Sequence, residues 1–211
     1  MWKKMLVIFD WDGVIVDTVD KLLDCFKDSV KEVLPEEDAE KARAYFDEQK
    51  GRPLEIIAEE LFGKEKAKIL VEKHLEKEKK ITSKNAAFLE VREIIEKLKA
   101  EGHTVAISTG FMHEEMWPRV VAAGLDDLLD EKLVVGFKPG FEKPDHVRHL
   151  LKQTGENYAV FFDDGLETVR RLKEKQIKAL YVVHFGKGGE VENHAEIVDK
   201  VREVSRGISR K

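Results

Sequence analysis

Five short apolar runs constrain the fold of this chain more than any other feature of its sequence. Polar residues or glycine bound each run, as is typical of strands covered on both faces. We therefore expect buried strands at Met5–Phe9, Thr104–Ser108, Lys132–Val135, Ala159–Phe162 and Ala179–Val183. Helical patterns separate most of these runs, and the clearest lies at Phe88–Leu98, before Gly102. This alternation predicts an α/β fold, with a parallel sheet and helices on both faces.

The alternation is interrupted after the first strand. Residues 18–86 contain no convincing strand, only amphipathic helical patterns. Their breaks fall at Pro35, Gly51–Pro53 and Gly63. We predict a small all-α domain over residues 18–86, inserted into a core formed by residues 1–17 and 87–211. Within the insert, the Lys/Glu run at residues 72–80 predicts a solvated helix face.

Composition and charge exclude several classes of partner. The net charge is −5, and no Lys/Arg cluster is large enough to suggest a nucleic-acid or membrane partner. Cys25 is the only cysteine, so the chain cannot form an internal disulfide. The first apolar run ends after five residues at Asp10, which is too short for a secretory signal or a membrane span. We expect a cytoplasmic protein.

The residues that follow the strands carry the chemistry. Asp10 and Asp12 follow the first strand, Ser108-Thr109-Gly110 the second, and Asp163-Asp164 the fourth. Two Lys-Pro pairs, at Lys138 and Lys143, lie near the third. Ligands of open parallel sheets bind outside the carboxyl ends of the strands, so these residues should meet at one edge.

Such a set of residues suits a phosphate ester bound beside a metal ion. Crowded carboxylates form a hard-cation site of the Mg²⁺ type. A lysine and a hydroxyl supply positive charge and hydrogen-bond donors to an anion, which beside Mg²⁺ is most simply a phosphate. A carboxylate in such a site can attack phosphorus, and a second acid can move the protons.

The same motifs resemble the haloacid dehalogenase (HAD) superfamily, in its phosphatase branch with a helical cap, similar to phosphoglycolate phosphatase. That family opens with a strand and D-x-D-G-[TV], matched by Asp10-Trp11-Asp12-Gly13-Val14. Its further motifs match Ser108-Thr109-Gly110, a Lys-Pro at a helix start, and Phe161-Phe162-Asp163-Asp164. The motifs occur in the family's order along nearly the whole chain. The resemblance implies a Rossmann-like core and a mobile helical cap over the active site.

The resemblance also implies roles for individual residues. Asp10 would be the nucleophile and a metal ligand. Asp12 would be the general acid and base, with its backbone carbonyl on Mg²⁺. Thr109, Gly110 and neighbouring amides would hold the phosphoryl group. Asp163 and Asp164 would complete the metal site. The cofactor would be Mg²⁺ and the partner a small phosphate ester.

Three assignments keep alternatives. Lys143 is preferred over Lys138 as the active-site lysine, because Lys143-Pro144-Asp145 stands directly at a predicted helix start. Thr109 is preferred over Ser108, because Ser108 takes the place of the strand's last apolar residue. In the cap, Arg52 or Lys50 would contact the distal part of the substrate; the alternative is that both side chains are solvated.

The function itself also keeps alternatives. A phosphosugar mutase of the same fold would need a cap residue that suppresses attack by water. A haloacid dehalogenase would lack an acid at position 12, which Asp12 contradicts. A binding protein without activity would not explain the intact acids.

Asp17-Thr18 predicts a helix N-cap. The histidines have no metal-ligand spacing, and His146 and His149 predict surface or packing positions. Oligomeric state and the ester itself remain open.

Overall fold

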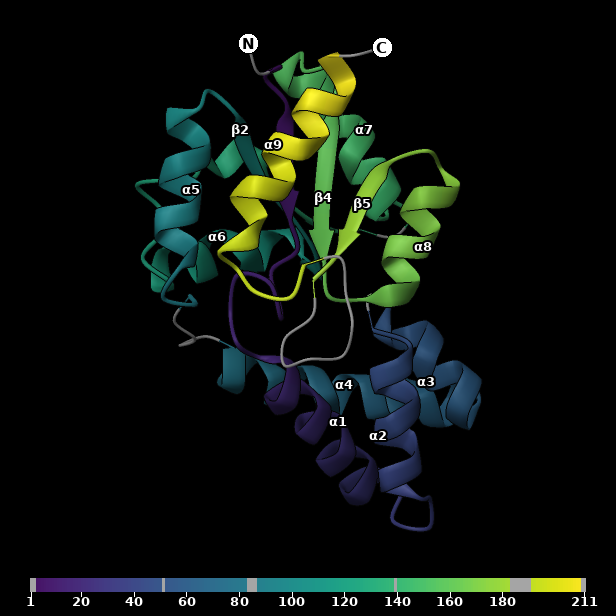
Figure 1. Ribbon diagram of the computed structural model, residues 1–211. Helices are drawn as coiled ribbons and strands as arrows, with labels where there is room; N and C mark the ends of the chain where they lie inside the picture. The colour runs from purple at the N-terminus through teal and green to yellow at the C-terminus, as the bar shows by residue number, and fades with distance from the viewer. Residues whose placement is uncertain (1–2, 51, 83–86, 139, 183–190, 210–211) are drawn as a thin grey trace.

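A five-stranded parallel sheet forms the centre of the protein. The computed structural model describes residues 3–50, 52–82, 87–138, 140–182 and 191–209. The strands are β1 (Leu6–Phe9), β2 (Thr104–Met112), β3 (Val134–Phe137), β4 (Ala159–Asp163) and β5 (Lys178–Tyr181). Their order is β3-β2-β1-β4-β5. The predicted α/β class is confirmed, and Figure 1 shows β4 and β5 running in the same direction.

One predicted strand begins too early. Residues Glu131–Leu133 form a 3₁₀ turn, and β3 starts only at Val134. The Asp130 carboxylate accepts a hydrogen bond from the Lys132 amide, which takes this segment out of the strand. β2, in contrast, continues beyond the predicted end at Ser108 as far as Met112. The predicted end of the last strand, Val183, lies outside the described residues.

Alternate residues of the strands face two separate apolar layers. Val7 and Phe9 pack with α5 (Val91–Ala100), α6 (His113–Ala122) and α9 (Glu196–Ser209). Leu6 and Ile8 pack on the opposite face with α7 (Lys143–Thr154) and α8 (Leu166–Glu174). The two-residue period of a strand explains why the runs are apolar throughout. The predicted helices on both faces are thereby confirmed.

Four helices form a separate group beyond the ends of the strands. They are α1 (Val19–Val33), α2 (Ala39–Glu48), α3 (Leu54–Phe62) and α4 (Lys64–Thr82). They share an apolar cluster of their own, which includes Phe26, Val30 and Leu70. Figure 1 shows them together on the side toward which β4 and β5 point. We call this group the cap. The predicted boundary at residue 86 falls in 83–86, outside the described residues, so the exact division stays a prediction.

The charged run at residues 72–80 is not simply a solvated face. His74 and Glu78 lie one turn apart on α4 and are buried, at 2% and 9% exposed, whereas Glu76 between them is exposed. One face of α4 therefore points inward although the sequence there is almost entirely charged. Within the described ranges, no helix combines the length and apolarity needed to cross a bilayer.

Candidate active site

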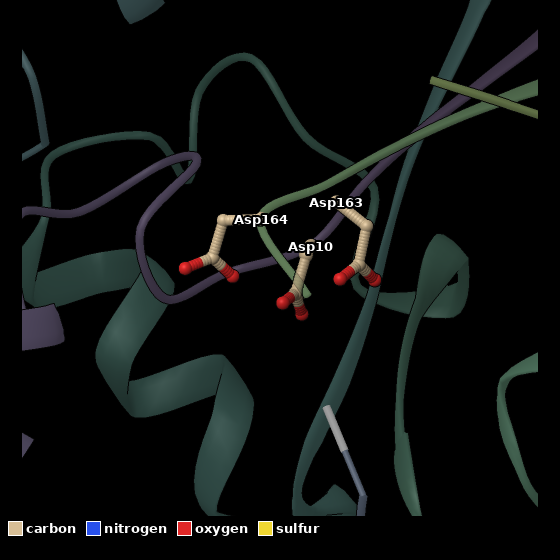
Figure 2. A group of neighbouring side chains, drawn as sticks. All are labelled: Asp10, Asp163 and Asp164. Carbon is tan, nitrogen blue, oxygen red and sulfur yellow. The ribbon is translucent and has the colours of Figure 1, made fainter. Parts of the chain in front are cut away.

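Three aspartates converge at the carboxyl end of the sheet. β1 and β4 are neighbours, with Phe9 opposite Phe162, so the next residues, Asp10 and Asp163, lie side by side. Asp164 follows directly. One carboxylate oxygen from each aspartate lies within 4.8 Å of the others. Figure 2 shows all three carboxylates pointing to the same side.

These carboxylates repel one another in a buried setting. Burial raises the pKa of Asp10 well above its usual value, and Asp163, Asp164 and Asp12 raise it further, while Lys143 opposes them. Burial, aided by Asp163, also raises the pKa of Asp164 to about 7, against the effect of Lys50. A cation bound between the carboxylates would relieve this repulsion. Three hard oxygen donors at this spacing fit Mg²⁺, so Asp10, Asp163 and Asp164 could hold it.

Lys143 is the lysine that reaches the acids. It is the first residue of α7, and its Nζ lies 2.7 Å from Asp163 Oδ2 and 3.0 Å from Asp10 Oδ2. Burial disfavours its charge, but the two carboxylates hold the pKa of Lys143 above its ordinary value. Lys138 is exposed instead, in a turn closed by a bridge to Phe141. The geometry favours Lys143, as the helix-start argument predicted.

Asp12 is held by the residue that begins the cap. The Thr18 hydroxyl donates a 2.5 Å hydrogen bond to the Asp12 carboxylate. Burial raises the pKa of Asp12 to about 6, and the bond from Thr18 limits the rise. Gly13 makes the turn between these residues possible: its φ is +68°, and a Cβ there would lie 2.5 Å from Asp164 Oδ2.

The N-cap prediction for Asp17-Thr18 is confirmed for the position of Thr18, but neither side chain caps the helix. Thr18 occupies the N-cap position of α1, but its side chain caps no helix amide, because the hydroxyl is engaged with Asp12. Asp17 is exposed. Thr18 follows Asp12 by six residues, a spacing that no motif of the sequence marks. Thr18 is therefore a candidate positioning residue that the pattern alone misassigned.

Replacing Thr18 by valine should lower turnover about tenfold, because a hydrogen bond to a charged group is lost while the side-chain shape is kept. We expect the loss in kcat, with KM nearly unchanged, since Thr18 orients Asp12 and does not line the cavity. Thr18→Ser, which keeps the hydroxyl, is the matched control. Equal kcat in Thr18→Val and the native protein would contradict the positioning role.

Ser108 and Thr109 point to different surroundings. The Ser108 hydroxyl lies 2.9 Å from His146 Nδ1, and His146 Nε2 lies 3.1 Å from the Phe141 carbonyl oxygen, which fixes Ser108 against α7. Thr109 instead lines the cavity beside the acids, with exposed Gly110 next to it. Thr109 Oγ1 accepts a bond from the Phe111 amide, which leaves its own proton to donate. The geometry favours Thr109, and it gives His146 a packing position.

A cavity of about 230 Å³ lies between the core and the cap. Its walls combine the acids, the lysine and threonine of the core with charged and apolar side chains of the cap. The core side includes Asp10, Asp12, Thr109, Gly110, Lys143 and Asp164. The cap side includes Leu22, Phe46, Lys50, Arg52, Leu54, His74 and Glu78. The cavity therefore brings nearly all the predicted site residues together.

The cap contributes cations at one end of this cavity. Lys50 Nζ lies 3.7 Å from Asp164 Oδ2 and 2.9 Å from Asp47 Oδ1. Arg52 also lines the cavity, but it forms a two-point ion pair with Glu60, at 2.6 and 3.0 Å. A Cβ on Gly165 would lie 2.6 Å from the Lys50 carbonyl oxygen, so glycine lets the cap approach β4. Lys50 is thus a cation of the cap that pairs with one of the three aspartates.

The sequence patterns did not predict two further buried charged residues, Glu78 of the cap and Arg119 of the core. Burial and the charge of Asp12 raise the pKa of Glu78 to about 8. Arg119 on α6 is buried too, with its guanidinium 3.8 Å from the Phe111 ring centroid and Nη2 3.4 Å from Glu115 Oε2. No motif marks these residues. The only signal for Glu78 was its spacing of four from His74, which places both on one helix face.

Comparison with known proteins assigns the family. The profile of haloacid dehalogenase-like hydrolases matches residues 7–182. Comparison with curated protein sequences finds no significant match.

Solved structures share the fold across nearly the whole chain. A hydrolase from Pseudomonas syringae is 17% identical with a TM-score of 0.75, covering 96% of this chain and 100% of that one. A protein from Clostridium acetobutylicum, described as a predicted phosphatase, is 18% identical with a TM-score of 0.72, covering 95% and 100%. One from Haemophilus somnus, described as a predicted phosphoglycolate phosphatase, is 18% identical with a TM-score of 0.64, covering 85% of each chain. From the profile match over most of its length, the chain belongs to the haloacid dehalogenase-like hydrolases.

Proposed function

We propose that the protein is a Mg²⁺-dependent phosphatase that hydrolyses a small phosphorylated metabolite through an aspartyl-phosphate intermediate. The observation that carries this proposal is the convergence of Asp10 with Lys143 and two further aspartates at one end of a cavity that Asp12 also lines. The descriptions of two solved relatives as phosphatases agree with it. A cytoplasmic location remains our expectation from the sequence.

In the first half-reaction, Asp10 attacks the phosphorus atom and Asp12 protonates the alcohol that leaves it. An Asp10 oxygen bonds to phosphorus, and the bond from phosphorus to the alcohol oxygen breaks. The Asp12 carboxyl gives its proton to that departing oxygen. Its pKa of about 6 places this proton in a range where transfer is favourable near neutral pH. The product alcohol leaves, and Asp10 carries the phosphoryl group.

In the second half-reaction, Asp12 works in reverse as a base. Its carboxylate takes a proton from water, whose oxygen bonds to phosphorus as the Asp10–phosphorus bond breaks. Inorganic phosphate leaves, and both aspartates return to their starting forms. Lys143 offsets the charge of Asp10 and of the phosphoryl oxygens, while Thr109 donates a hydrogen bond to them. Bound Mg²⁺ would supply further positive charge to the phosphoryl oxygens.

A Mg²⁺ titration tests this function. With a panel of phosphate esters, release of inorganic phosphate should require Mg²⁺, disappear with excess EDTA and return when Mg²⁺ is restored. In the absence of substrate, Mg²⁺ should raise the melting temperature, because it relieves the repulsion among the three aspartates. Metal-independent release would contradict the mechanism. Conversion of a sugar phosphate to its isomer without phosphate release would identify a mutase instead.

A further inference from the structure

Charged side chains of both signs line the cavity. Lys143 and Lys50 lie beside the aspartates, where the phosphoryl group would bind. Four glutamates also line the cavity: Glu55 on α3, Glu78 on α4, Glu115 on α6, and the partly exposed Glu142 directly before α7. Glu55 and Glu115 are partly or fully exposed, whereas Glu78 is buried. Among these glutamates, Glu78 is therefore the one that a bound substrate would contact away from bulk water.

The surroundings hold Glu78 in place against the core. His74 Nε2 lies 3.7 Å from Glu78 Oε2 on the same face of α4. The next residue, Lys79, pairs with Glu115 of α6 at 2.8 Å and so joins the cap helix to the core. Glu115 in turn pairs with Arg119. The Lys79–Glu115 ion pair thus anchors α4 to the core directly beside Glu78, which lines the cavity.

Much of the remaining lining of the cavity is apolar. It includes Leu22, Leu23, Phe46, Leu54, Phe111 and Met112. Apolar walls favour the carbon skeleton of a ligand, and a few placed polar groups orient it. When it is ionised, a buried carboxylate among such walls makes a second negative charge unfavourable, because little solvent separates the two charges. It can form hydrogen bonds with hydroxyl groups in either protonation state.

We propose that Glu78 is a specificity-determining residue, which hydrogen-bonds a hydroxyl of the leaving alcohol and rejects phosphate esters whose alcohol carries a carboxylate. This inference rests on the proposed function, since it names the substrate class of that same site. It separates the protein from an enzyme for phosphoglycolate, whose alcohol bears a carboxylate. The favoured class is the phosphate monoester of a small neutral alcohol with further hydroxyl groups.

Two ratios of kcat/KM test the role of Glu78. Glycerol 1-phosphate and propyl phosphate differ in hydroxyl groups alone, and glycerol 1-phosphate and phosphoglycolate compare a neutral alcohol with an anionic one. In the native protein both ratios should favour glycerol 1-phosphate. In Glu78→Leu the first ratio should fall about tenfold, because the hydrogen bond is lost. In Glu78→Gln, measured at pH 9, where the native Glu78 is ionised, the first ratio should hold and the second should fall about tenfold, because only the charge is lost.

Glu76→Gln is the matched control, two residues away on the same helix and exposed. It removes the same charge outside the cavity and should change neither ratio. Hydrolysis with both ratios unchanged in Glu78→Leu and Glu78→Gln would overturn the role of Glu78 and leave the phosphatase standing. A native preference for phosphoglycolate would also overturn it. Phosphate release from other esters of the panel but from none of these three would overturn the inference alone. No phosphate release from any ester of the panel with Mg²⁺ would overturn the proposed function as well.

Discussion

Asp10→Asn should abolish turnover while the protein stays folded. Loss of the nucleophile removes the covalent route entirely, so kcat should fall on the order of 10⁵-fold. The free energy of unfolding should increase instead. A carboxyl group whose pKa is raised by folding destabilises the folded state above its unfolded pKa, near 4, and this penalty is present at neutral pH. A neutral amide of the same shape removes the penalty.

The measurement pairs steady-state phosphate release with thermal unfolding in metal-free buffer at pH 7. We expect a higher melting temperature for Asp10→Asn than for the native protein, together with a smaller gain when Mg²⁺ is added. Asp17→Asn, which removes an exposed carboxylate near the same strand, is the control and should change neither property. Turnover that survives in Asp10→Asn would contradict the aspartyl-phosphate mechanism.

Lys143→Ala should lose both activity and stability. Lys143 is 7% exposed and lies within 3.0 Å of two carboxylates, so its removal leaves those charges buried without their partner. Breaking a buried ion pair in this way costs about 3–5 kcal/mol of unfolding free energy. Activity should fall about 10³-fold, because the group that offsets the charge of the phosphoryl oxygens is gone.

Lys138→Ala is the control for this change, since Lys138 is the other lysine of a Lys-Pro pair. It is exposed, so we expect native kcat and a change in unfolding free energy within about 0.5 kcal/mol. Urea denaturation and phosphate release give both quantities for each variant. An active Lys143→Ala beside an inactive Lys138→Ala would reverse the assignment of the lysine.

The fold could be predicted because its pattern is local. Strands buried on both faces read as short apolar runs, and a helix reads as a period of 3.6 residues. The error at Lys132 and Leu133 has a local cause as well: the Asp130 side chain captures the Lys132 amide, and a run of apolar letters does not reveal that competition. The insert could be located because it lacked strands, although only the family resemblance, and not its helical pattern, implied a placement over the sheet edge.

The acids and hydroxyls of the site followed from one rule, since parallel strands bring their carboxyl ends to one edge. Asp10 and Asp163 meet across more than 150 residues because β1 and β4 pair in register. What the rule could not supply is the direction of each side chain. Ser108 and Thr109 are adjacent in sequence, yet one binds His146 and the other lines the cavity.

By itself, the sequence determined the class of fold, the order of the motifs and the acids that meet at the sheet edge, because these depend on periodicity and strand order. The tertiary structure decided which lysine reaches those acids, that Thr18 holds Asp12, and that Glu78 faces the cavity. Each depends on how helices from the core and the cap approach one another. Burial and partnership arise only from that packing, so identical residue types, such as Lys138 and Lys143 or Glu76 and Glu78, differ in role.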